Sequence, residues 1–372
     1  MRVHWFLPTA GDSHGITSGG QAASTVDTER PPDLGYLALV ARAAERLGFE
    51  GVLTPTGTFC EDAWLTTAAL IGETSTLKFL VAFRPGFLSP TLAAQMASTY
   101  QRISGGRLML NIVTGGESTE QRRFGDWLDH DQRYARTAEF IAVLRGAWSG
   151  SPFDFAGDHY RVAGATVRAV PDPVPPLFFG GSSAPALRVA AEHVEVYLTW
   201  GEPPAAVAAK LDAVRTLGKD HNRSLEYGIR LHVISRDTAA AAWDAARALL
   251  DRVPPAAVAA ARERFARTES EGQRRMAALS GGGDLEVAPN LWAGFGLVRP
   301  GAGTALVGSH DEVAERIAEY HALGVDHFIL SGQPHLEEAH WFGEGVLPLL
   351  RRDGLLAGAP ATRPLHLVPT PL

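Results

Sequence analysis

Strand-like and helix-like segments alternate along most of this 372-residue chain, and that alternation restricts the fold more than any other feature. Short apolar runs predict strands, and apolar residues at helical spacing predict the helices between them. The expected strands cover residues 3–7, 51–55, 77–83, 108–113, 177–179, 194–199, 227–236 and 325–330. This pattern predicts an α/β protein, a (β/α)₈ TIM barrel. The alternative is two openly packed halves, although no linker-like change of composition divides the first six strands.

Three segments interrupt the alternation. Residues 153–170 read as an inserted hairpin, and residues 305–307 as a short extra strand. The longest insertion, about 254–303, lies between the seventh and eighth strands and includes an expected helix at 256–266. Long insertions in compact domains are often lids, so we expect one here. We expect residues 1–353 to form a single domain, followed by a Pro-rich tail at 354–372.

Composition excludes several classes of function. The net charge is −7 and the basic residues are dispersed, which argues against a nucleic-acid partner. Cys60 is the single cysteine, so no intramolecular disulfide can form. No apolar run is long enough for a membrane span, and the N-terminus lacks a signal-peptide layout. These features predict a cytoplasmic protein with no membrane partner.

The seventh expected strand carries an unusual pair of side chains. Because side chains alternate along a strand, Arg230 and His232 share one face, while Ile229, Leu231 and Val233 share the other. A cation beside an imidazole in an apolar strand is costly to bury unless an anion compensates it. The pair is therefore either an edge-strand pair or part of an anion site.

Further polar and unusual residues gather near the carboxyl ends of the expected strands, where barrel enzymes have their active sites. They are Asp12, His14, Thr56, Cys60, Arg84, Asn111, Ser182, Ser183, Trp200, Arg230, His232, Arg299, Gln333 and His335. This clustering favours the anion-site interpretation of the pair on the seventh strand.

Two local patterns suggest how a phosphate-bearing ligand could be held. Residues 180–183, Gly-Gly-Ser-Ser, join a strand to a helix whose N-terminus offers free N–H groups. His130 and Tyr134 lie four residues apart at the start of a helix and can face one ligand. Each pattern has an ordinary structural alternative, a tight turn and a helix cap. Cys60 is either a nucleophile or a semi-buried thiol.

Other cofactor and metal motifs are missing. The chain has no dinucleotide fingerprint, no Walker loop, no His-x-His after the first strand and no His-Glu-x-x-His. We therefore predict no metal site.

Several blocks together resemble the two-component alkanesulfonate monooxygenases of the bacterial luciferase family, over nearly the whole chain from Arg2 to about Leu350. The blocks are VHWFLPT at 3–9, PTG at 55–57, CEDAW at 60–64, NIVTG at 111–115, FGGSS at 179–183, YLTWGEPP at 197–204, GIRLHVI at 228–234, NLWAG at 290–294 and PHLEE at 334–338.

The resemblance implies a TIM-barrel monooxygenase that uses O₂ and reduced FMN to cleave the C–S bond of an organosulfonate into an aldehyde and sulfite. A separate NAD(P)H-dependent flavin reductase would supply the reduced FMN, and the chain would form a homodimer or homotetramer. The implied FMN ligands are Thr56, Asn111, His130, Tyr134, Ser182 and Ser183. The implied catalytic residues are Trp200, Arg230, His232, Arg299 and Cys60, and the implied substrate pocket holds His14, Gln333 and His335.

Four departures from the family pattern affect the substrate region. Ala10 replaces His, Gln333 replaces Tyr, Thr58 replaces a common Arg, and the loop at 16–29 is longer than usual. Because glutamine cannot transfer a proton usefully, His232, His335 or water would take over from Tyr, with His232 the better candidate. Two further hypotheses are the same flavin chemistry on another substrate (a sulfinate, a sulfone or a non-sulfur compound) and flavin binding without turnover.

Overall fold

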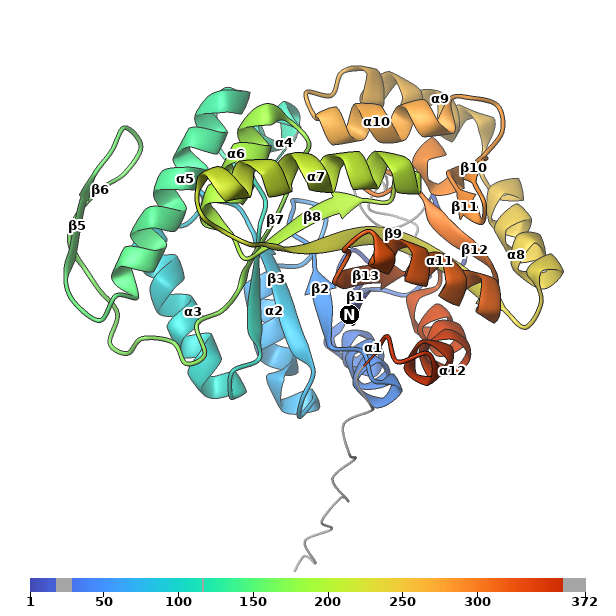
Figure 1. Ribbon diagram of the computed structural model, residues 1–372, viewed down its shortest axis with the longest axis horizontal. Coiled ribbons are helices and arrows are strands. Elements are labelled where there is room, and N and C mark those ends of the chain that lie inside the picture. Colours follow the sequence, from blue (N-terminus) through green and yellow to red (C-terminus); the bar gives the residue numbers. More distant parts are fainter. Residues whose placement is uncertain (18–28, 116, 357–372) are drawn as a thin grey trace, which may run out of the picture.

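Eight parallel strands close into a barrel in the computed structural model, which describes residues 1–17, 29–115 and 117–356 (Figure 1). Strand β1 pairs with β2 on one side and with β13 on the other, and β9 pairs with both β8 and β13. The predicted (β/α)₈ barrel and all eight of its predicted strands are confirmed. The barrel strands are β1 (Arg2–Phe6), β2 (Gly51–Thr54), β3 (Lys78–Phe83), β4 (Leu108–Ile112), β7 (Leu177–Gly180), β8 (Val196–Trp200), β9 (Glu226–Arg236) and β13 (His327–Ser331).

Helices surround the barrel, and α1 shows how the sequence sets their limits. The Asp33 carboxylate accepts a hydrogen bond from Tyr36 N at the start, and Gly48 ends the helix at φ 90°. The helices outside the long insertion are α1 (Leu34–Leu47), α2 (Ala63–Leu70) with a 3₁₀ turn at Ile71–Glu73, α3 (Pro90–Ser104), α4 (Ser118–Arg123), α5 (His130–Ala147), α6 (Ala184–His193), α7 (Pro204–Asp220), α11 (His310–Ala322) and α12 (His335–Arg352).

Apolar side chains form two concentric layers. The larger layer lies between the barrel and its helices and includes Ile229, Leu231 and Val233, as strand alternation predicts. A smaller layer fills the barrel interior with Leu53, Leu80, Met109, Phe178, Val196, Leu198 and Ile329. Burying one large apolar side chain stabilises the fold by about 1.5–3 kcal/mol. The inner layer therefore packs beneath the polar side chains at the carboxyl ends of the strands and supports them.

The long insertion is mostly helical and covers one side of the barrel mouth (Figure 1). The predicted helix at 256–266 is confirmed as α9 (Pro255–Ala266). The extra strand predicted at 305–307 is confirmed as β12 (Ala305–Ser309), which runs parallel to the second half of β9. The other elements of this region are α8 (Ala239–Asp251), α10 (Glu271–Ser280), β10 (Glu286–Ala288), β11 (Leu291–Trp292) and the 3₁₀ turn Gly294–Leu297.

The predicted hairpin is also confirmed, by the antiparallel strands β5 (Phe153–Ala156) and β6 (Arg161–Ala165), which project from the side of the barrel (Figure 1). Most of the 16–29 loop and of the predicted tail, at 18–28 and 357–372, lies outside the described residues. Among the residues described, no helix combines the length and apolar character needed to cross a membrane.

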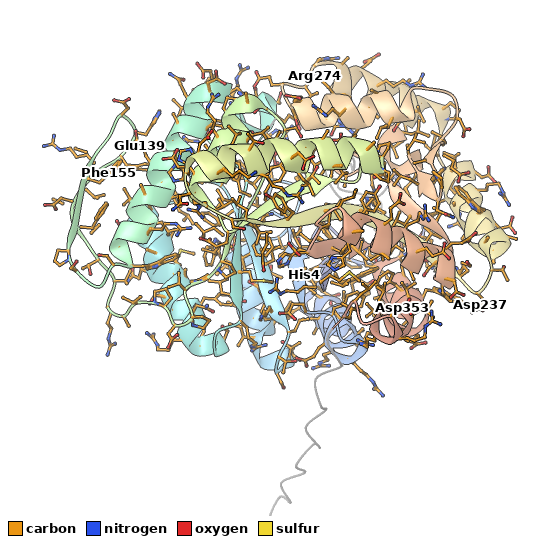
Figure 2. The ribbon with its side chains drawn as sticks, in the orientation of Figure 1. His4, Glu139, Phe155, Asp237, Arg274 and Asp353 are labelled. Atoms are coloured by element: carbon orange, nitrogen blue, oxygen red, sulfur yellow. The ribbon has the colours of Figure 1, made fainter. Side chains whose placement is uncertain are left out.

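A buried histidine relay lies at the amino-terminal end of the barrel. His4, labelled in Figure 2, contacts His327 through Nε2 and Nδ1 at 3.0 Å. His327 Nε2 in turn lies 2.9 Å from a carboxylate oxygen of Glu226, which also pairs with Arg2. Burial, followed by the positive charges of His327, Arg2 and Lys78, lowers the pKa of His4 well below its usual value.

Folding stability should therefore fall as the pH drops below about 6.5, because the unfolded chain gains a proton at His4 that the folded chain does not. One such group changes the free energy of unfolding by up to about 1.4 kcal/mol per pH unit. We expect His4→Phe to lose the contribution of His4 to the slope of the free energy of unfolding against pH. Urea unfolding between about pH 7 and pH 5 measures this slope. His221→Gln, at an exposed position, is the control. Equal slopes in His4→Phe and the wild type would contradict this prediction.

Candidate active site

A cavity of about 720 Å³ opens at the carboxyl ends of the barrel strands, beneath the insertion. That volume is in the range of small-molecule and cofactor sites. The predicted site residues that line it are Thr56, Asn111, His130, Tyr134, Ser182, Ser183, Trp200, Arg230, His232, Arg299 and His335. The structure thus brings together residues from strands β4, β8 and β9, helices α5 and α12, and the insertion.

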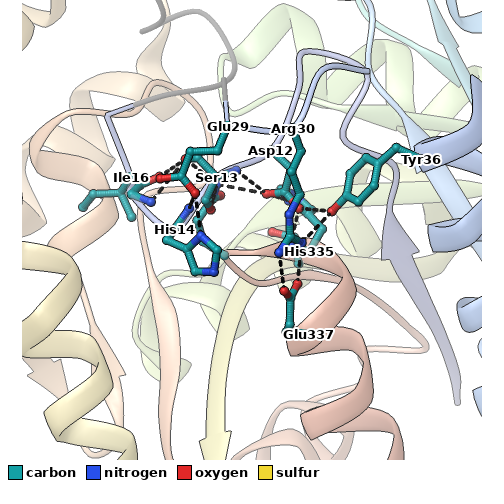
Figure 3. A network of polar contacts seen from close by, with 12 residues as sticks. Asp12, Ser13, His14, Ile16, Glu29, Arg30, Tyr36, His335 and Glu337 are labelled. Carbon is teal, nitrogen blue, oxygen red and sulfur yellow. Dashed lines mark hydrogen bonds and ion pairs between the residues drawn. The ribbon is translucent and has the colours of Figure 1, made fainter. Parts of the chain in front are cut away.

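Three predicted residues are not part of the cavity wall. The Cys60 thiol lies 3.7 Å and 3.6 Å from the carbonyl oxygens of Pro55 and Gly57. Burial raises the pKa of Cys60 to about 12, so the reactive thiolate is scarce near neutral pH. His14 Nδ1 pairs with the Glu29 carboxylate at 2.5 Å on a half-exposed surface (Figure 3).

Gln333 is the third of these residues, and it is buried behind the wall. Its amide nitrogen donates to the carbonyl oxygen of Ser13 at 2.8 Å and to Asp12 Oδ1 at 3.1 Å. The side chain therefore holds the loop after β1 in place and does not face the cavity.

One end of the cavity fits a phosphate group. Ser183 precedes α6 without forming a side-chain cap, and its buried hydroxyl has no hydrogen-bond partner in good geometry. A Cβ added at Gly181 would lie 2.5 Å from Ala186 Cβ, so only glycine allows the loop to pass so close to the helix. The centroids of the His130 and Tyr134 rings lie 4.8 Å apart, and the Tyr134 hydroxyl is 3.3 Å from that Cβ position at Gly181. Free donors at a helix N-terminus beside two ring side chains can hold the phosphate of FMN.

At the other end of the cavity, Arg230 is a mostly buried cation, and no ion pair to it is found in the described parts of the chain. It donates to Leu231 O at 2.5 Å, to Ile329 O at 3.5 Å and to Ser331 Oγ at 2.8 Å. A guanidinium has five N–H donors, so two are left for a ligand. Burial, with a smaller effect of Arg299, lowers the pKa of Arg230 to about 9, so the group stays charged at neutral pH.

Arg299 brings a second cation from the insertion. Its Nε donates to the carbonyl oxygen of Ile16 at 2.9 Å, and its guanidinium lies 6.0 Å from the Phe295 ring. Burial lowers the pKa of Arg299 to about 10, whereas the charge of Asp12 acts in the opposite direction. Ile16 is itself buried beside Phe295 and Val298. The loop after β1 and the insertion therefore meet next to the cavity.

His232 is held in a neutral state by its surroundings. Its Nε2 donates to Ala302 O at 3.1 Å, and its Nδ1 accepts from Ser331 Oγ at 2.8 Å. The ring stacks on Phe295 with centroids 3.9 Å apart. Burial, followed by the nearby cations, lowers the pKa of His232 well below its usual value. With both ring nitrogens engaged, the structure argues against His232 as the proton donor expected from the sequence.

Asp12 organises the adjoining part of the site, where β1 and β13 end side by side (Figure 3). Its carboxylate accepts from His335 Nδ1 at 2.9 Å, from the His335 backbone N at 2.7 Å and from the Tyr36 hydroxyl at 2.5 Å. Although burial opposes ionisation, His335 and the other donors lower the pKa of Asp12 to about 2. Asp12 is thus a fixed anion behind His335, whose ring lines the cavity. Sequence reasoning placed Asp12 near the site without giving it a role.

The cavity wall also contains a buried ion pair, Arg84 with Glu120, at 2.6 Å. The other carboxylate oxygen of Glu120 accepts from Thr58 N at 3.0 Å. Arg84 follows β3 and was part of the predicted cluster, whereas Glu120 on α4 was missed. No strand pattern or spacing in the sequence connects Glu120 to the site.

The luciferase-like monooxygenase family model matches residues 1–327 of the chain. Solved structures share the fold. A riboflavin lyase solved with modified FMN and riboflavin is 21% identical, with 97% of this chain and 94% of that chain covered and a TM-score of 0.81. A long-chain alkane monooxygenase is 18% identical, with 96% of this chain and 92% of that chain covered and a TM-score of 0.76. An EDTA monooxygenase from Chelativorans sp. BNC1 is 19% identical, with 96% of this chain and 95% of that chain covered and a TM-score of 0.72.

We predict that Gly181→Ala weakens binding of reduced FMN by about fivefold or more, because overpacking costs roughly 1–3 kcal/mol and 1.4 kcal/mol is a factor of ten. Anaerobic titration followed by tryptophan fluorescence measures this affinity without turnover. Gly282→Ala is the matched control, since a Cβ there meets no atom within 4 Å. An unchanged affinity in Gly181→Ala would place the phosphate elsewhere.

Proposed function

Because the chain belongs to the luciferase-like monooxygenase family, we propose that it is a reduced-FMN-dependent monooxygenase that cleaves the C–S bond of an organosulfonate. The observation that carries the substrate class is Arg230, a mostly buried guanidinium in the cavity with two N–H donors left for a ligand. A cation in that environment favours an anionic ligand over a neutral one.

Reduced FMN would lie with its phosphate against Ser182, Ser183, His130 and Tyr134, and with its ring toward Thr56 and Asn111. When bound, it supplies two electrons for the activation of O₂. In the overall reaction, a sulfonate, O₂ and reduced FMN give an aldehyde, hydrogen sulfite, oxidised FMN and water. One oxygen atom enters the new C=O group, and the other leaves as water.

The sulfonate would be held between Arg230 and Arg299. A sulfonate is a permanent anion with three acceptor oxygens, and a guanidinium offers planar paired donors to such a group. Trp200, at the end of β8, limits the cavity on the side of α10, where a Cβ at Gly272 would lie 3.0 Å from the indole. Apolar groups such as Phe6, Ala10 and Ile329 also line the cavity and would surround the organic part of the substrate.

We further propose that the insertion acts as a lid and that a separate NAD(P)H-dependent flavin reductase supplies reduced FMN. Helices α9 and α10 border the cavity, and Gln273 of α10 accepts from Gly301 N at 2.8 Å, close to Arg299. Closure over the ligands would keep water from the reactive oxygen chemistry.

Sulfite release tests the proposal. The enzyme is supplied with FMN, a flavin reductase, NADH and a panel of alkyl and aryl sulfonates, with sulfinates and neutral sulfones as further arms. Sulfite from sulfonates supports the proposal. Product from sulfones alone would reject the anion site, and tight binding of reduced FMN with no product from any arm would indicate a flavin-binding protein without turnover.

Arg230→Ala should lower kcat/KM for desulfonation by at least about tenfold, because a hydrogen bond to a charged group contributes roughly 1.5–3 kcal/mol. Arg230→Lys should recover only part of the loss, since an ammonium lacks the planar fork. The affinity for reduced FMN should change much less than kcat/KM.

Arg247→Ala is the control for loss of one arginine, because Arg247 is exposed on α8 and pairs only with Asp244 among the described residues. Sulfite release by Arg230→Ala at the wild-type rate would reject the assignment of Arg230.

The lid proposal predicts ligand-dependent protection from trypsin. Arg267 lies between α9 and α10 with its side chain 79% exposed, so we expect an early cut there. Reduced FMN with a sulfonate should slow that cut, while the cut after exposed Arg168, beyond the hairpin, serves as the internal reference. Equal rates at Arg267 with and without ligands would show that the insertion does not close.

A further inference from the structure

We propose that His335, oriented by Asp12, is the catalytic residue that holds and delivers the proton needed for the oxygen atom that leaves as water. This inference rests on the proposed function, because it assigns a step in that reaction to one side chain.

The geometry of the His335 ring supports this role. With Asp12 as an anion, Nδ1 carries hydrogen and donates to Asp12 Oδ1 at 2.9 Å. The backbone N of His335 also donates to that carboxylate, and the indole N–H of Trp5 donates to the His335 carbonyl oxygen. Three contacts therefore fix the start of α12 and the plane of the ring. In the described parts of the chain Nε2 has no hydrogen-bond partner, and the residue lines the cavity.

The other candidate proton donors fit less well. Both ring nitrogens of His232 are engaged, and Cys60 and Gln333 do not line the cavity. Tyr134 lies at the phosphate end, beside Ser183. Arg230 serves as a fixed cation whose loss of a proton would remove the anion site. Among the described side chains at the anion end, His335 is the one with a free nitrogen and a carboxylate behind it.

Charges on several elements act on this ring. The Asp12 carboxylate lies against the ring, whereas β9 and the insertion bring positive charges near it. Tyr36 and Arg30 act indirectly, because Tyr36 donates to Asp12 and Arg30 donates to Tyr36 at 3.3 Å. The charged and titratable groups around His335 are Asp12, Tyr36, Arg30, Arg230, His232, Arg299, Glu337 and Glu338.

In the proposed step, Nε2 of His335 both gives and receives one proton in each turnover. Nε2 gives its proton to the departing oxygen atom and takes back the proton that the sulfonate-bearing carbon loses when its C=O group forms. The electrons come from reduced FMN and from the cleaved C–S and C–H bonds, as in the overall reaction. His335 therefore returns to its starting protonation state after each turnover.

The test combines a titration with a pH–rate profile. Imidazole NMR of the full-length protein gives the titration midpoint of His335, with its signal assigned by its loss in His335→Gln. Asp12→Asn should lower that midpoint by about 1–3 pH units, because an adjacent opposite charge is lost. The high-pH limb of kcat for sulfite release should move down by the same amount, and His335→Gln should remove that limb and lower kcat by about 10²-fold or more.

Tyr36→Phe is the matched control, because it removes one donor to Asp12 and leaves the carboxylate in place. It should shift neither the midpoint nor the limb by a comparable amount. If Asp12→Asn does not fold, the His335→Gln profile and the wild-type titration still decide whether the limb belongs to His335. A wild type that releases no sulfite from any sulfonate rejects the proposed function. A wild type that releases sulfite, with a limb that His335→Gln leaves in place, rejects only the role of His335.

Discussion

Strand β9 is the element on which both the barrel and the site depend, because it is paired on both edges and its partner changes along one edge. Residues 226–230 pair with β8, and residues 232–236 pair with β12. The change falls at Arg230 and His232, where Gly201 N donates to Arg230 O and His232 N donates to Thr304 O. The two edge partners diverge there, so the inward side chains at this point face an open cavity.

Charges of both signs meet at this part of the cavity. Arg230 and Arg299 carry positive charge there, while the carboxylate of Asp12 lies behind His335, near enough for its charge to act on Arg299. Bringing buried cations together without a carboxylate against Arg230 costs stability, and a bound anion would offset that cost. A sequence that paired Arg230 internally with an acidic residue would avoid this cost and would lose the proposed ligand site.

The sequence predicted the barrel well because the necessary information is local. Alternation along β9 placed Ile229 and Leu231 against the helices and Arg230 in the interior, and the structure agrees. Most of the residues expected at the strand ends also line the cavity. The network behind the wall could not be predicted, since Asp12 reaches Tyr36 and His335 only through tertiary contacts. For the same reason, the sequence made Gln333 part of the pocket, whereas its amide is bound to the loop after β1.

The loop after β1 contacts the insertion, and this contact explains how substrate choice could change while the barrel stays the same. Asp12 and Arg30 pair through their backbones at the base of the loop after β1, and Arg30 also binds Glu337 of α12. A fixed base lets the loop lengthen without disturbing the barrel. From that loop, the carbonyl of Ile16 accepts from Arg299 of the insertion. The guanidinium proposed to bind the substrate is therefore oriented by a backbone atom of the loop after β1, which the sequence resemblance predicts to be unusually long. Changes in that loop can reposition the anion site while the strands that carry Arg230 remain in place.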